Sequence, residues 1–109
     1  MIHGLRRLLA ILALVTVLVA CGSGSSTAVG IVTDVESRSL TEVDGFTIRT
    51  EEGTFMTFRI GNLELDAGAF PASHLHEHLA TAQPIAIAYR AEPGGNIAYR
   101  LVDAPWAQP

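Results

Sequence analysis

An uncharged apolar run near the start divides the chain into two unequal parts. Leu8–Ala20 is thirteen residues long and contains one polar side chain, Thr16. Arg6 and Arg7 precede the run, as in the charged and apolar regions of an export signal. The run is shorter than the roughly 20 apolar residues that cross a bilayer core, so a signal helix is favoured over a permanent transmembrane helix. Removal of residues 1–20 would leave 89 of the 109 residues, enough for one small domain.

The end of this run resembles the lipobox of bacterial lipoprotein precursors. The pattern is a leucine, a branched residue, a small residue and an obligatory cysteine, supplied in order by Leu18, Val19, Ala20 and Cys21. The resemblance implies cleavage after Ala20, attachment of a diacylglyceryl group to the Cys21 thiol, and acylation of the new amine with a chain such as palmitate. Cys21 is the only cysteine, so it has no partner for an intramolecular disulfide.

The residues that follow Cys21 suit a tether. Gly22–Thr27 consists mostly of glycine and serine, which form flexible linkers. Each buried acyl CH₂ contributes about 0.8 kcal/mol, so two or three chains would hold the protein stably on a bilayer. We therefore expect residues 21–27 to tie the domain to the outer face of a bacterial membrane, either the cell membrane or the outer membrane.

The charge of the remaining chain excludes one class of partner. All seven basic residues are arginines, and five of them lie after the signal segment, against eleven acidic residues. The mature chain therefore carries a net charge of −6. Proteins that bind DNA or RNA neutralise phosphates with cationic side chains, so we expect no nucleic-acid partner.

Residues 28–103 carry the pattern of five strands and one helix. Apolar residues alternate with polar ones, and turn residues separate the runs. We expect strands over 28–36, 40–50, 55–60, 85–90 and 97–102, and a helix over 70–82. The second of these strands contains Asp44-Gly45, a turn signal, so two short strands joined by a turn are an alternative there.

The same alternation assigns side chains to faces. Gly30 marks a bend in the first strand, and Phe55 falls on the outer face of the third. Three residues of the last strand are assigned to one face: Ile97, Tyr99 and Leu101.

The helix expected over 70–82 has a candidate cap at Ser73 and ends before Pro84. Ser73 suits an N-cap position, and the residue before a proline is pushed out of helical geometry. Leu75, Leu79 and Ala82 recur at the spacing of a buried stripe.

The predicted order of elements is three strands, one helix and two strands. This order resembles that of the OB-fold, a small five-stranded Greek-key barrel. The family's helix commonly lies between the third and fourth strands. The resemblance implies an all-β fold class, β-rich with one helix, over residues 28–103, with residues 104–109 as a tail that contains Trp106. Many OB-folds bind nucleic acid through arginine or lysine interleaved with aromatic residues. This domain is acidic, and most of its strand aromatics are in core register, so we do not expect that function here.

One histidine-rich segment could carry chemistry. His74, His76 and His78 alternate with Leu75 and Glu77. On a helix, His74 and His78 are neighbours with Glu77 close to both. His76 points elsewhere on a helix. The two imidazoles of His74 and His78 can bind Zn²⁺ or Cu²⁺, with Glu77, Asp66 or Glu64 as possible further ligands. The alternative is a polar helix flank, in which the histidines cover the apolar stripe.

This segment also matches the H-x-x-E-H pattern of inverted zinc metallopeptidases. Such enzymes need a further ligand from a second helix, and we expect only one helix here. No G-x-S-x-G, phosphate-binding loop or G-x-G-x-x-G is present. We therefore expect the protein not to be an enzyme, and we expect no cofactor apart from the Zn²⁺ or Cu²⁺ of the alternative.

Together these features predict a lipid-anchored, non-enzymatic module that contacts an envelope protein or a second copy of itself. Phe55, Trp106 and the sheet edges are candidate contacts. The alternative is a metal-binding envelope protein that uses His74, His78 and Glu77.

Overall fold

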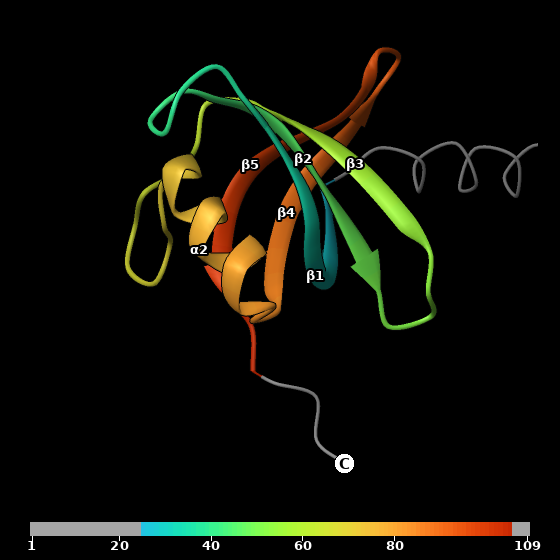
Figure 1. Ribbon diagram of the computed structural model, residues 1–109. Helices are drawn as coiled ribbons and strands as arrows, with labels where there is room; N and C mark the ends of the chain where they lie inside the picture. Colours follow the sequence, from blue (N-terminus) through green and yellow to red (C-terminus); the bar gives the residue numbers. More distant parts are fainter. Residues whose placement is uncertain (1–24, 106–109) are drawn as a thin grey trace, which may run out of the picture.

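Five strands form a closed barrel with one helical segment packed against it (Figure 1). The computed structural model describes residues 25–105. Its elements in chain order are β1 (Ser26–Ser37), β2 (Val43–Thr50), β3 (Phe55–Ile60), the 3₁₀ helix η1 (Ala72–His74), α2 (Leu75–Thr81), β4 (Ile85–Glu92) and β5 (Gly95–Asp103). The predicted order and the OB-fold-like barrel are confirmed. The predicted signal segment, Cys21 and Trp106 lie outside the described residues.

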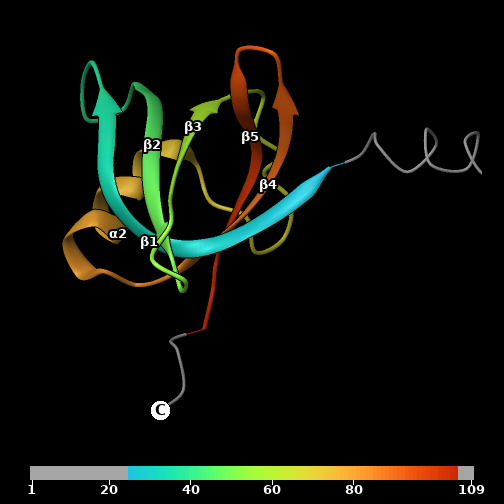
Figure 2. The ribbon, with the colours of Figure 1, turned by 90° about the vertical axis from the view of Figure 1, so that its right-hand side faces the viewer.

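The first strand, β1, bends so that it pairs with two neighbours (Figure 2). Residues 26–30 are antiparallel to β4, and residues 30–37 are antiparallel to β2. Gly30 belongs to both ladders, and a Cβ there would lie 2.5 Å from the backbone oxygen of Arg49. Glycine therefore permits this close approach, and the predicted bend is confirmed. The strand begins at Ser26, so the last two residues of the predicted tether belong to the barrel.

The barrel closes where β3 meets β5. Residues 58–60 pair in parallel with residues 96–98, while β1 and β4 pair on the opposite side. Each of the five described strands therefore has neighbours on both sides. The sheet edges that we expected as contact sites are paired in this closed arrangement.

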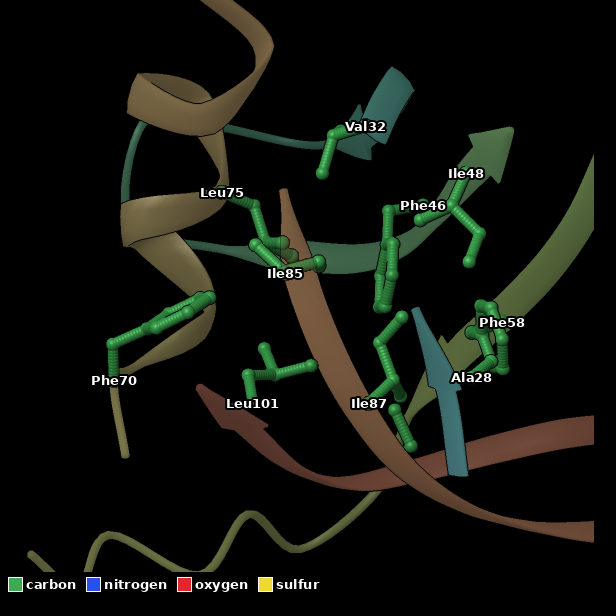
Figure 3. Packing of buried hydrophobic residues seen from close by; sticks show 11 residues of the cluster. Ala28, Val32, Phe46, Ile48, Phe58, Phe70, Leu75, Ile85, Ile87 and Leu101 are labelled. Carbon is green, nitrogen blue, oxygen red and sulfur yellow. The ribbon is translucent and has the colours of Figure 1, made fainter. Parts of the chain in front are cut away.

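Aromatic and branched side chains fill the barrel (Figure 3). Phe46 and Phe58 lie opposite each other on β2 and β3, and their rings stack with centroids 5.1 Å apart. Tyr89 meets Phe58 edge-on at the same distance. The buried cluster consists of Ala28, Val32, Phe46, Ile48, Phe58, Phe70, Leu75, Ile85, Ile87, Ala98 and Leu101. Phe55 is 65% exposed on the outer face, as predicted.

Two β-bulges break the alternation in the longest strands. The pairing of β5 with β4 skips Tyr99, and the pairing of β1 with β2 skips Thr33. Ala98 and Leu101, on either side of the first bulge, are buried, whereas Ile97 and Tyr99 are only partly buried. A bulge adds one residue and so interrupts the two-residue period. The prediction that Ile97, Tyr99 and Leu101 share one face is therefore wrong.

The second strand is continuous and shorter than predicted. It begins at Val43, because residues 38–42 form a loop in which the Ser39 hydroxyl accepts hydrogen bonds from the backbone N–H groups of Thr41 and Glu42. Asp44 is skipped in the pairing with β1. The Asp44-Gly45 signal thus marks a bulge and not a turn.

The helical segment starts as a 3₁₀ turn. Neither Pro71, at the start of η1, nor His74, at the start of α2, forms a side-chain cap hydrogen bond, and Ser73 lies inside η1. The Ser73 N-cap prediction is therefore wrong, because Pro71 already fixes an extended backbone that leads into the turn. Within residues 25–105, no helix is long and apolar enough to cross a membrane.

The buried face of α2 also differs from the predicted stripe. Leu75 and His78 are buried, whereas Leu79 is 41% exposed and Ala82 lies exposed beyond the helix. A helix of seven residues has only about two turns, so one i, i+3 pair covers its inner face. The inner face therefore includes a histidine.

Candidate metal centre

Two histidines and one aspartate come together where the helix meets the end of the last strand. His74 ends η1 and His78 lies four residues later on α2, a spacing that places both on one side. Asp103 ends β5 and pairs with Ile85 at the start of β4. Because β4 starts soon after α2 ends, this pairing brings Asp103 beside the helix. Ligand atoms from His74, His78 and Asp103 all lie within 4.8 Å of one another.

The ring of His78 is held in one orientation. Its side chain is 2% exposed, and its Nδ1 atom lies 2.9 Å from the carbonyl oxygen of Gln83. A carbonyl oxygen only accepts hydrogen bonds, so Nδ1 carries a proton, and in the neutral form of the ring Nε2 keeps the lone pair. Ala82 makes this contact possible: it adopts a left-handed conformation with φ 59° and donates its N–H to the His78 carbonyl.

Among residues 25–105, the Nε2 atom of His78 has no hydrogen-bond partner although a carboxylate is close. It lies 2.8 Å from Oδ1 of Asp103, yet it is fully buried and forms no hydrogen bond with the described residues. The carboxylate oxygen therefore lies beside the axis along which a ring N–H would donate. A buried polar atom without a partner costs about 1–3 kcal/mol.

His74 also has a polar neighbour at Nδ1. This atom lies 3.0 Å from Oε2 of Glu77, within ion-pair distance. In metal sites, a ligating histidine usually donates its other ring N–H to a carboxylate or a backbone carbonyl, which fixes the tautomer. The Gln83 carbonyl has this position beside His78, and the Glu77 carboxylate lies close enough to His74 to take it.

Phe70 forms one wall of the cluster. Its ring stacks on His78 with centroids 4.9 Å apart and packs at a tilt on His74 at 5.0 Å. The two imidazoles meet edge-on, with centroids 5.1 Å apart. Phe70 is itself 8% exposed, so the apolar core supports the rings of both histidines from one side.

The structure brings together part of the predicted site and adds a residue to it. His74 and His78 are neighbours, as predicted, whereas Glu77 lies beside Nδ1 of His74 at 3.0 Å and is not in the donor group. Asp103 takes the place expected for Glu77. In the sequence, Asp103 stands out only as a carboxylate at the end of the last strand. The pairing of β5 with β4 brings Asp103 to the helix, and this pairing cannot be inferred from the spacing of residues in the sequence.

Other predicted residues lie elsewhere or outside the described part. Glu64, a possible further ligand, is not in the donor group, and neither is His76, which was expected to point elsewhere. Asp66 accepts a hydrogen bond of 2.8 Å from Arg100 on β5 and is thus engaged with a cation. The predicted lipidation and cleavage site, Cys21 with Ala20, precedes residue 25, where the description begins.

The cluster presents two nitrogen atoms and one carboxylate oxygen on a rigid frame. This mixed set suits borderline ions such as Zn²⁺ and Cu²⁺, whereas Ca²⁺ and Mg²⁺ prefer oxygen ligands throughout. Comparison of the chain with protein-family models, curated proteins and solved structures finds no match.

Proposed function

We propose that the chain is a lipid-anchored, non-enzymatic binding module of the bacterial cell envelope, and that it binds Zn²⁺ or Cu²⁺ through His74, His78 and Asp103. One observation carries the metal proposal: the buried Nε2 atom of His78 faces the Asp103 carboxylate at 2.8 Å without a hydrogen bond. In the neutral form of the imidazole, the buried Nε2 atom and the carboxylate oxygen are two acceptors held close together. A cation bound by both would turn this repulsion into attraction.

The donors could surround an ion after small movements. Zn–N and Zn–O bonds are about 2.0–2.2 Å long, so two ligands of one tetrahedral ion lie roughly 3.3 Å apart. The contact between His78 and Asp103, at 2.8 Å, would lengthen by about 0.5 Å around the ion. The donors of the whole group, within 4.8 Å of one another, would close by an ångström or two around the ion.

Equilibrium dialysis of the unlipidated domain, without a histidine tag, tests the metal proposal. We expect one Zn²⁺ or Cu²⁺ per chain with micromolar or tighter affinity. Loss of a residue that only supports a metal ligand costs about 10- to 100-fold in affinity, so we expect at least that loss in His74→Ala and in Asp103→Asn. His76→Ala is the matched control, because it removes a histidine of the same helix that is outside the donor group. Equal binding by all four proteins would refute the proposal.

The anchor is proposed from the sequence pattern around Cys21. Five peptide steps separate Cys21 from Ser26, the first residue of β1, a reach of about 17 Å at full extension. A lipid on Cys21 would thus keep the barrel next to the membrane. The tests are the intact mass of the membrane-bound protein and a Cys21→Ala variant, and a variant that is still cleaved and still membrane-bound contradicts the lipid anchor.

A second candidate function is contact with an envelope protein or a second copy of the chain, favoured by the exposed Phe55. This ring is 65% exposed, and its cross-strand partner Arg49 is exposed as well. Crosslinking in the native membrane tests this function. Capture that is unchanged in Phe55→Ser would exclude this ring as the contact.

A further inference from the structure

We infer that the metal-loaded cluster binds an anionic oxygen donor, a carboxylate or phosphate oxygen of a second molecule, at an open coordination position. This inference rests on the proposed metal site and adds the class of ligand that the site would take. It follows from the number of donors, their exposure and their summed charge.

The described residues supply fewer ligands than the ion requires. Zn²⁺ in proteins takes four ligands, and sites with three protein ligands keep the fourth position for water or an exchangeable molecule. The donor group within residues 25–105 has three members. Glu77 is the nearest further carboxylate on the helix, and its Oε2 atom is engaged with Nδ1 of His74 at 3.0 Å.

The exposure of the three donors places the open position toward solvent. The side chain of His78 is 2% exposed, that of His74 36% and that of Asp103 55%. Phe70 closes the inner side by packing on both imidazoles. A bound ion would thus have His78 and Phe70 on its buried side. His74 and Asp103 would flank it, and the open coordination position would face solvent.

The charge of the loaded site selects the kind of ligand. A divalent ion with two neutral imidazoles and one carboxylate keeps a net charge of +1. The charge of Glu77 is separated from the ion by the ring of His74, so it compensates less than a direct ligand would. An anionic oxygen at the open position neutralises the site, whereas a neutral donor does not.

The test uses Cu²⁺-loaded protein and its visible absorption band. Sodium acetate and inorganic phosphate are titrated separately at constant ionic strength, with Cu²⁺-loaded His76→Ala as a control for the fold. We expect a saturable shift of the band with at least one of the two anions, in both proteins. In Asp103→Asn, saturated with Cu²⁺, the loaded site gains one positive charge, so we expect anion affinity about tenfold higher.

Each outcome decides between the two proposals. Failure of the wild-type protein to bind Cu²⁺ overturns the metal site itself. One bound Cu²⁺ without any saturable shift up to high anion concentration leaves the metal site standing and overturns this inference. A shift that appears only in Glu77→Gln also overturns it, because the Glu77 carboxylate then occupies the position in the natural chain.

Discussion

At the scale of single residues, the burial of His78 depends on a hydrogen bond to a backbone carbonyl. The imidazole of His78 is buried against Phe70, because the Gln83 carbonyl satisfies one ring nitrogen. A buried polar side chain needs such a partner, and a partner formed by a backbone carbonyl leaves no trace in the pattern of side chains.

Replacement of His78 should destabilise the protein more than replacement of His74. His78→Ala removes the hydrogen bond to Gln83 and leaves a cavity beside Phe70, so we expect a loss of about 2–4 kcal/mol in the free energy of unfolding. His74→Ala removes a side chain that is 36% exposed and paired with an exposed carboxylate, so we expect about 1 kcal/mol or less. Urea denaturation in the presence of a chelator measures both, and equal losses would contradict the burial of His78.

At the scale of elements, the sequence predicted where strands occur better than which way their side chains point. The third strand has the predicted bounds, since turn residues flank it closely and its alternation is unbroken. In β1 and β5 the bulges at Thr33 and Tyr99 shift the inward positions. Neither bulge has a local signal, because a bulge is set by how the paired strands must curve to close the barrel.

The bend of β1 should depend on the absence of a side chain at Gly30. In Gly30→Ala the new Cβ would meet the backbone oxygen of Arg49 at 2.5 Å, and β1 pairs with β2 and β4 at this residue. We expect a loss of about 2–3 kcal/mol or more, because backbone atoms on both sides must move. The neighbouring Val29 is 50% exposed, so Val29→Ala should cost less than about 1 kcal/mol. Denaturation midpoints compare the two, and a Gly30→Ala variant as stable as the wild type would show that the bend tolerates a side chain.

The loop between β3 and η1 should loosen from β5 in acid. Arg100 on β5 donates to the Asp66 carboxylate at 2.8 Å and to the Ala67 carbonyl at 3.1 Å. The hydrogen bond from Arg100 holds the pKa of Asp66 below its usual value of 3.8. A carboxyl with a lowered pKa in the folded state stabilises the protein above its usual pKa, and this contribution is lost as the pH falls through the lowered value.

We therefore expect the stability of the wild-type protein to fall between about pH 5 and pH 2, and to fall less steeply in Asp66→Asn. Urea midpoints across this range give the two slopes. Arg100→Gln removes the donor and should flatten the dependence as well. Parallel slopes in all three proteins would exclude a role for this pair in acid unfolding.

At the scale of the whole molecule, the candidate site depends on closure of the barrel. The helical pair of His74 and His78 could be predicted from spacing alone. Asp103 reaches that pair only because β5 returns antiparallel to β4 and ends opposite Ile85, next to the helix. The Ala104 N–H donates to the Pro84 carbonyl at 2.9 Å and fixes this end of the strand. Residues far apart in the chain thus become ligands of one candidate site, which no local motif could reveal.

Because the donors come from the helical segment and from the last strand, a bound metal should stabilise the whole domain. A ligand that binds only the folded state at a free concentration 100 times its dissociation constant adds about 2.7 kcal/mol. For a domain of this size that would raise the midpoint of thermal unfolding by roughly 10–20 °C. Scanning calorimetry with Zn²⁺ or Cu²⁺ should show this rise in the wild type and in His76→Ala, and little of it in His74→Ala or Asp103→Asn. A rise of the same size in all four proteins would mean that the metal acts elsewhere, and that the contact between His78 and Asp103 serves only to pack the helix onto the barrel.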